Sequence, residues 1–101
     1  MILVYFIANS DGFIKIGYTK NIKQRIQTLK TGSSSSMYLC GYINLGTYEL
    51  EQQLHKKFHC KQGEWFYPNG LVDYINLNSD MMAEVENVDG KIYVYKKMKC
   101  V

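Results

Sequence analysis

The sequence predicts an α+β domain built on a small antiparallel sheet, with elements in the order strand, strand, helix, strand, helix and an appended tail. Two observations carry this prediction. Two β-rich runs, 2–8 and 13–18, are separated by a turn that contains Asp11-Gly12, which is typical of a hairpin. Apolar residues at helical spacing then follow in two places, each behind a residue that can cap a helix.

Each of the two predicted helices has a capping residue in front of it. Asn21 would cap the first helix, whose apolar stripe at i, i+4 and i+7 consists of Ile22, Ile26 and Leu29. Gly32 would end this helix, and the serine tract 33–36 after it predicts a loop. Thr47 would cap the second helix, which carries the apolar stripe Leu50, Leu54 and Phe58.

The remaining segments are mostly predicted as strands. A third strand is expected over 38–44 and another over 91–96, where apolar and polar residues alternate. Residues 71–77 fit either a short helix or a further strand. We therefore divide the chain into a domain, residues 1–78, and a C-terminal extension, residues 79–101, that contributes a strand packed on the same domain.

Composition is that of a globular protein with one small domain. The chain has 101 residues, of which 47% are hydrophobic and 21% charged. No apolar run approaches the ~18 residues of a transmembrane helix, so we expect no membrane association. The three cysteines form no C-x-x-C pair and follow no secretory signal. We therefore expect reduced thiols, no disulfide-linked partner, and an intracellular protein of the cytoplasm or nucleus.

Charge is unevenly distributed along the chain. Residues 1–63 hold eight Lys or Arg and three Asp or Glu, whereas residues 64–101 hold four and six. The stretch 14–31 has no acidic residue and five cations, namely Lys15, Lys20, Lys23, Arg25 and Lys30. A stretch of one sign on a small domain attracts phosphate, and a solvated helix face is the alternative interpretation.

Three residues near the hairpin are candidates for chemistry. Tyr5 and Lys15 lie on its two strands, so their side chains can meet across one face of the sheet. The alternative is that Lys15 occupies the solvent side of an alternating strand. Arg25 is the only arginine and flanks the apolar stripe of the first helix. From there its guanidinium could make a bidentate hydrogen bond to a phosphate, or its side chain could extend along the helix surface into solvent.

The second helix carries the remaining candidates. Glu51 and His55 are one helical turn apart, and Glu51 projects beside the apolar stripe. A carboxylate at that boundary could ligate Mg²⁺, which prefers oxygen ligands, and an ordinary surface Glu–His pair is the alternative. His55, His59 and Cys60 also suggest zinc, but structural zinc sites usually need a second ligand pair, and Cys40 stands alone.

Taken in order, these residues resemble the signatures of the GIY-YIG nuclease superfamily over residues 2–75. Leu3-Val4-Tyr5 stands at the first signature and Lys15-Ile16-Gly17 at the second, so the first lacks its glycine and the second its tyrosine. The asparagine that often closes the family's active site has no clear match. The set KIGYT, LHxxF and GEWF is similar to a subgroup common in phages and large DNA viruses.

The resemblance implies a fold, a reaction and a site. The fold would be a small three-stranded antiparallel sheet flanked by helices. The reaction would be hydrolysis of phosphodiester bonds in DNA with one divalent ion, Mg²⁺ or Mn²⁺. Tyr5 would activate the attacking water with help from the Lys15 ammonium, because tyrosine has an ordinary pKa near 10 and a base needs a stabilised phenolate. Arg25 would hold the scissile phosphate, and Glu51 would carry the metal.

The resemblance also assigns supporting roles. The residues expected to orient this site from behind are Tyr18, His55 and Glu64, and the alternative for His55 and Glu64 is that they simply fix the helix and the loop. Separately from the resemblance, the stretch without acidic residues predicts that Lys20, Lys23 and Lys30 bind the DNA backbone. We expect the four central side chains, Tyr5, Lys15, Arg25 and Glu51, to converge on one concave face. Two alternatives stay open. One is a catalytically silent nucleic-acid- or protein-binding module of a virus or phage. The other is a host-interaction protein that works through its acidic tail. Whatever its function, a viral protein of this kind is expected in the host-cell cytoplasm.

Overall fold

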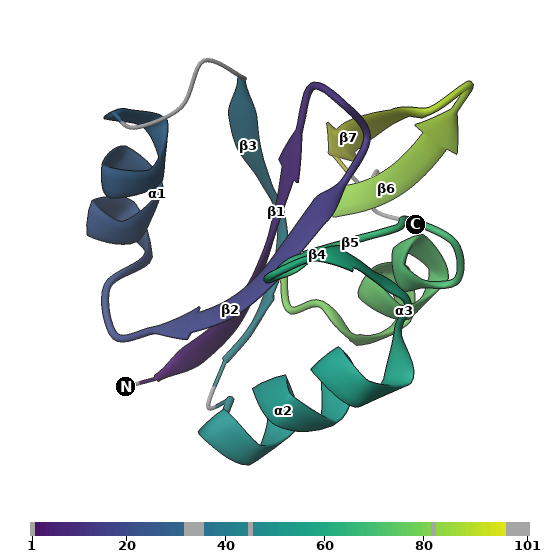
Figure 1. The fold of residues 1–101 in the computed structure, drawn as a ribbon. Helices are drawn as coiled ribbons and strands as arrows, with labels where there is room; N and C mark the ends of the chain where they lie inside the picture. The colour runs from purple at the N-terminus through teal and green to yellow at the C-terminus, as the bar shows by residue number, and fades with distance from the viewer. Residues whose placement is uncertain (1, 32–35, 45, 82, 97–101) are drawn as a thin grey trace, which may run out of the picture.

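The computed structural model describes residues 2–31, 36–44, 46–81 and 83–96. These residues form seven strands and three helices, whose arrangement Figure 1 shows. In chain order they are β1 (Leu3–Asn9), β2 (Ile14–Thr19), α1 (Ile22–Thr31), β3 (Met37–Ile43), α2 (Tyr48–Lys57), β4 (Cys60–Gln62), β5 (Trp65–Phe66), α3 (Leu71–Asn78), β6 (Ala83–Val88) and β7 (Lys91–Lys96).

The sheets correct the predicted fold class. Strands outweigh helices, and they form a five-stranded antiparallel sheet in the order β3-β1-β2-β5-β4 together with a separate β6–β7 pair. The expected three-stranded sheet flanked by helices is therefore wrong. The reason is that two short strands continue the sheet beyond the hairpin. Ile14 and Lys15 of β2 pair with Phe66 and Trp65 of β5, and β4 pairs with β5 in turn.

The predicted hairpin of β1 and β2 is confirmed, and its turn is built by side-chain and backbone features together. The Asn9 carboxamide oxygen accepts hydrogen bonds from the backbone N–H groups of Asp11 and Phe13. Gly12 has φ of +86°, a left-handed conformation that glycine adopts without steric cost. This turn sets the register in which Tyr5 lies opposite Gly17 and Ile7 opposite Lys15.

Alternation along β1 sends its side chains to two different layers. Val4, Phe6 and Ala8 belong to the main buried cluster, which also takes in Leu54 of α2 and Leu71 and Ile75 of α3. Tyr5 and Ile7 point to the opposite face, as residues one position apart on a strand must. Figure 1 shows α1 on one side of the sheet and α2 and α3 on the other. The Tyr5 face is thus the α1 face.

Both predicted helix caps are present. The Asn21 side chain accepts a hydrogen bond from the Gln24 N–H of α1, and Thr47 accepts one from the Leu50 N–H of α2. The ambiguous segment 71–77 lies in a helix, α3, which begins after Gly70. Gly32, expected to end the first helix, lies outside the described residues, as do positions 33–35 of the expected serine loop.

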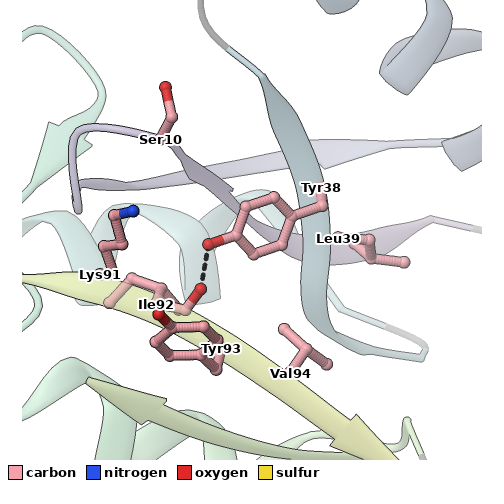
Figure 2. Close-up of a pocket in the computed structure, with 7 residues that line it drawn as sticks. All are labelled: Ser10, Tyr38, Leu39, Lys91, Ile92, Tyr93 and Val94. Carbon is pink, nitrogen blue, oxygen red and sulfur yellow. Dashed lines mark hydrogen bonds between the residues drawn. The ribbon is translucent and has the colours of Figure 1, made fainter. Parts of the chain in front are cut away.

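The β6–β7 hairpin packs beside α3 and the edge of the large sheet. The Asn76 side chain makes two hydrogen bonds with the backbone of Val85, which fixes β6 against α3. The Tyr38 hydroxyl of β3 donates a hydrogen bond to the Ile92 carbonyl of β7, as Figure 2 shows. Both residues line a cavity of about 530 Å³. Within the described residues, no helix has the length and apolar character needed to cross a membrane.

Candidate functional site

Tyr5 is held in place from below by a glycine. Its side chain is almost completely buried, and its ring lies directly over Gly17 on the neighbouring strand. A Cβ atom added to Gly17 would overlap the hydroxyl oxygen and the adjacent ring carbon of Tyr5. The glycine of the Lys15-Ile16-Gly17 motif is therefore needed for space, because only a residue without a side chain lets the tyrosine lie flat across β2.

Arg25 meets Tyr5 from the α1 helix. Its Nε atom donates a hydrogen bond of 3.1 Å to the Tyr5 hydroxyl oxygen. This hydrogen bond raises the pKa of Arg25, and the Glu64 carboxylate raises it further, because both groups favour the charged guanidinium. Arg25 is thus a fixed positive charge in contact with the phenol oxygen.

Lys15 points to the same face of the sheet but has a different partner from the one expected. It pairs in register with Ile7, two positions along β1 from Tyr5. Its Nζ atom lies 2.6 Å from Oε2 of Glu64 and 5.6 Å from the centre of the Trp65 ring. The hydroxyl of Tyr5 therefore has Arg25 as its hydrogen-bond partner, and the Lys15 ammonium is paired with a carboxylate.

Glu51 forms a second group, together with His55, on α2. The Glu51 side chain is only 5% exposed, and its Oε1 atom accepts a hydrogen bond of 2.8 Å from Gln52. Nε2 of His55 lies 3.7 Å from the same carboxylate oxygen and 2.9 Å from the Ile16 carbonyl oxygen. Since a carbonyl oxygen can only accept, the His55 ring carries its proton on Nε2.

The backbone of Ile16 links the two groups. Its N–H donates to the Glu64 carbonyl at 3.3 Å, and its C=O accepts from His55. Both contacts lie along the outer edge of β2, which pairs with β5 only at Ile14 and Lys15. Among the described residues, no hydrogen bond or ion pair joins Glu51 to Tyr5, Lys15 or Arg25. Tyr5, Lys15 and Arg25 therefore lie on the α1 face, whereas Glu51 reaches the outer edge of β2 from the α2 face. The expected convergence of all four side chains on one concave face is thus not observed.

A polar groove of about 240 Å³ opens beside Arg25. Its other lining residues are neutral and polar, namely Thr19, Asn21, Gln24 and Thr28. Lys20 and Lys23 are exposed near the start of α1, whereas the Lys30 side chain lies outside what the structure describes. The groove combines one charged fork with hydroxyl and amide donors, which is a lining suited to phosphate oxygens.

Two of the supporting residues have roles that the sequence did not indicate. Tyr18 points to the opposite face from Tyr5 and packs edge-on against Tyr48 of α2, with ring centres 5.4 Å apart. It therefore braces α2 and does not line the site. Glu64 makes direct contact with Lys15, and no sequence signal indicated this because β5, which brings the Glu64 turn to β2, was not predicted.

The residues near Glu51 fit a metal ion that takes one carboxylate from the protein and its other ligands from water and substrate. Within the described residues, no three His, Cys, Asp or Glu side chains gather closely enough to form a metal site of their own. Glu51 offers carboxylate oxygens, and His55 is committed to the Ile16 carbonyl. Mg²⁺ keeps several waters and commonly takes only one or two protein carboxylates plus substrate phosphates, so a single glutamate suits it.

The fold and these groups define a small antiparallel-sheet domain with a tyrosine–arginine pair at a polar groove. Comparison with protein families matches residues 2–85 to the T5orf172 domain. The chain therefore belongs to the T5orf172 domain family, which is associated with phage endonucleases of the GIY-YIG and HNH kinds. Neither the curated proteins nor the solved structures searched contain a match to the chain.

Proposed function

We propose that this chain is a metal-dependent DNA endonuclease of the GIY-YIG type. The observation that carries the proposal is the 3.1 Å contact between Tyr5 and Arg25, which are far apart in the sequence. The reaction needs one group to take a proton from water and one to hold a phosphate, and these two side chains meet beside a polar groove. Membership of the T5orf172 family, with its association with phage endonucleases, supports the same conclusion.

Tyr5 would act as the general base. Its oxygen accepts a hydrogen bond from the Arg25 guanidinium, so a negative charge on that oxygen is stabilised by a positive one in direct contact. A phenolate supported in this way takes a proton from the water that attacks phosphorus. The packing of the ring on Gly17 keeps the oxygen at one position, which saves the cost of orienting the base during the reaction.

Arg25 would also hold the scissile phosphate. Its Nε atom is engaged by Tyr5, which leaves the two Nη groups to make a bidentate contact with phosphate oxygens. One guanidinium would then touch both the base and the phosphate, and it would set the distance between them. The neutral donors of the groove would bind further phosphate oxygens of the same strand.

Glu51 would hold one divalent ion, Mg²⁺ or Mn²⁺, at the outer edge of β2. When bound, such an ion supplies positive charge for the oxygen that leaves phosphorus. Gln52 and His55 would keep the Glu51 carboxylate oriented, since one donates to it and the other anchors the helix to Ile16. Burial of Glu51 favours this role, because a buried carboxylate gains most from a cation.

A nicking assay on supercoiled plasmid tests the proposal. The wild type should convert the plasmid to nicked or linear DNA in Mg²⁺ or Mn²⁺ but not in chelator, and Glu51→Gln should abolish the conversion. Glu49→Gln is the matched control, because Glu49 lies exposed in the first turn of the same helix. Cleavage by Glu51→Gln at the wild-type rate would contradict the metal role. If the wild type binds DNA but cuts none with either metal, the chain is a silent nucleic-acid-binding module.

A further inference from the structure

The ion pair between Lys15 and Glu64 occupies the α1 face of the sheet beside the tyrosine–arginine pair. The Lys15 side chain is only 12% exposed, whereas that of Glu64 is 43% exposed. The Glu64 carboxylate also acts on Arg25, whose charged form it stabilises. One carboxylate therefore pairs with Lys15 and acts at longer range on Arg25, on a face where the proposed function needs free positive charge.

Lys15 has two contacts that do not depend on the Glu64 carboxylate. The Trp65 ring lies 5.6 Å from its ammonium, and the strand position opposite Ile7 fixes its backbone. A mostly buried ammonium nevertheless needs a negative partner, because its desolvation is costly. Lys15 is thus a preformed anion site, at which one negative group can take the place of another.

Glu64 is well placed to be that exchangeable occupant. It lies in the turn between β4 and β5, beside Gly63, and its side chain is the more exposed member of the pair. Its backbone carbonyl is anchored separately by the Ile16 N–H. The carboxylate can therefore rotate into solvent while the turn and β5 stay paired with β2.

We propose that Glu64 is an internal substitute for a DNA phosphate: its carboxylate fills the Lys15 anion site in the free protein and is displaced by a backbone phosphate when DNA binds. This inference rests on the proposed function in that DNA is the displacing anion. Because the Glu64 carboxylate must first leave Lys15, DNA binds more weakly than it would without this carboxylate. As a result, the positive charge of Lys15 is available only when the backbone of a bound DNA displaces the Glu64 carboxylate.

The test measures DNA affinity in chelator, where cleavage plays no part. Glu64→Gln keeps the shape of the side chain and removes its charge, so it should tighten duplex binding about three- to tenfold. Glu84→Gln, an exposed carboxylate on β6, is the control for net charge and should change affinity less than twofold. In a Lys15→Met background, Glu64→Gln should give no gain beyond that of the control. Equal effects of the two glutamine variants, or a gain that persists without Lys15, would overturn the proposal.

A second probe separates this inference from the nuclease proposal. Inorganic pyrophosphate should raise the melting temperature of Glu64→Gln at concentrations several-fold lower than for the wild type, and Lys15→Met should abolish the difference. If this shift is seen but the wild type neither binds nor cuts DNA, the anion site stands and the nuclease proposal fails. If the wild type cuts DNA but Glu64→Gln behaves like the control with both probes, Glu64 is a structural ion-pair partner and only the present inference fails.

Discussion

The ring of Tyr5 lies across the backbone of Gly17, and the absence of a side chain at Gly17 is what makes room for it. The two residues are cross-strand partners in the hairpin, so the contact is a direct consequence of its register. It places the phenol oxygen where Arg25 of α1 can donate a hydrogen bond to it. A motif residue with no chemistry of its own thus determines where the proposed base stands.

Gly17→Ala should therefore destabilise the protein and displace Tyr5. A methyl group at this position overlaps the ring, and overpacking of this kind costs about 1–3 kcal/mol of unfolding free energy. Urea denaturation of the wild type and the variant measures the cost. In a Tyr5→Leu background the same substitution should cost clearly less, because the overlapping ring is gone. An equal cost in both backgrounds would mean that Gly17 is required for a reason other than Tyr5.

The parts of the fold that the sequence predicted are those with local signals. Asp11-Gly12 marked the first hairpin, and Asn21 and Thr47 marked two helices, because turn and cap chemistry depends on a few neighbouring residues. β4 and β5 were missed, since one has three exposed residues and the other only two residues. Strands that short carry no periodicity and form only because β2 offers an edge.

The same limit explains the site. Tyr5 and Arg25 lie on elements that were predicted, and the resemblance assigned both to one reaction, Tyr5 to the attacking water and Arg25 to the scissile phosphate. The contact between Lys15 and Glu64 depends on β5, so no local pattern of residues predicts it. Lys15 was expected to support Tyr5, but the register puts it opposite Ile7, where the nearest carboxylate is that of the β4–β5 turn.

Arg25→Ala and Glu51→Ala should both abolish cleavage but differ in DNA binding. Loss of Arg25 removes a charged phosphate contact, so duplex affinity in chelator should fall and cleavage should drop at least a hundredfold. Loss of Glu51 removes a negative charge, so metal-free affinity should be unchanged or slightly higher. Tyr5→Phe should resemble Glu51→Ala, with binding kept and cleavage lost. Gel shifts in chelator beside cleavage in Mg²⁺ measure both properties. Full activity of Tyr5→Phe would exclude Tyr5 as the base.

The exposed lysines near α1 should contribute to affinity without regard to DNA sequence. Lys20→Glu/Lys23→Glu reverses two charges on a stretch without acidic residues, so affinity should fall about tenfold or more at low salt. The dependence of log Kd on log salt should also become shallower. Lys56→Glu/Lys57→Glu makes the same change of net charge at the end of α2 and serves as the control. Equal losses in the two double variants would show that net charge, and not the α1 surface, sets the affinity.

The two described cysteines should differ sharply in reactivity. Cys40 on β3 is 1% exposed and donates a hydrogen bond from Sγ to the Phe6 carbonyl, whereas Cys60 on β4 is exposed. Burial raises the pKa of the Cys40 thiol to about 12, and the thiolate is the reactive form. Iodoacetamide at pH 8 should label Cys60 and leave Cys40 unmodified until urea unfolds the chain. Peptide mapping by mass spectrometry reads out each site, and labelling of Cys40 in the native protein would contradict its burial.

The raised pKa of Cys40 also predicts how stability depends on pH. The ordinary pKa of a cysteine thiol is 9.0 and the folded value is about 12, so between these values the unfolded chain loses a proton that the folded chain keeps. The unfolding free energy should therefore be independent of this group below about pH 8 and fall as pH rises from 9 toward 12, by at most about 1.4 kcal/mol per pH unit. Burial raises the pKa of Tyr38 and Tyr74 as well, which adds a further loss of unfolding free energy at higher pH.

Cys40→Ala should lower stability at pH 7 through its cavity, yet it should flatten the decline that begins near pH 9. Urea denaturation at pH 7, 9 and 10 compares the two slopes, and identical slopes for wild type and Cys40→Ala would show that the thiol does not titrate differently in the two states.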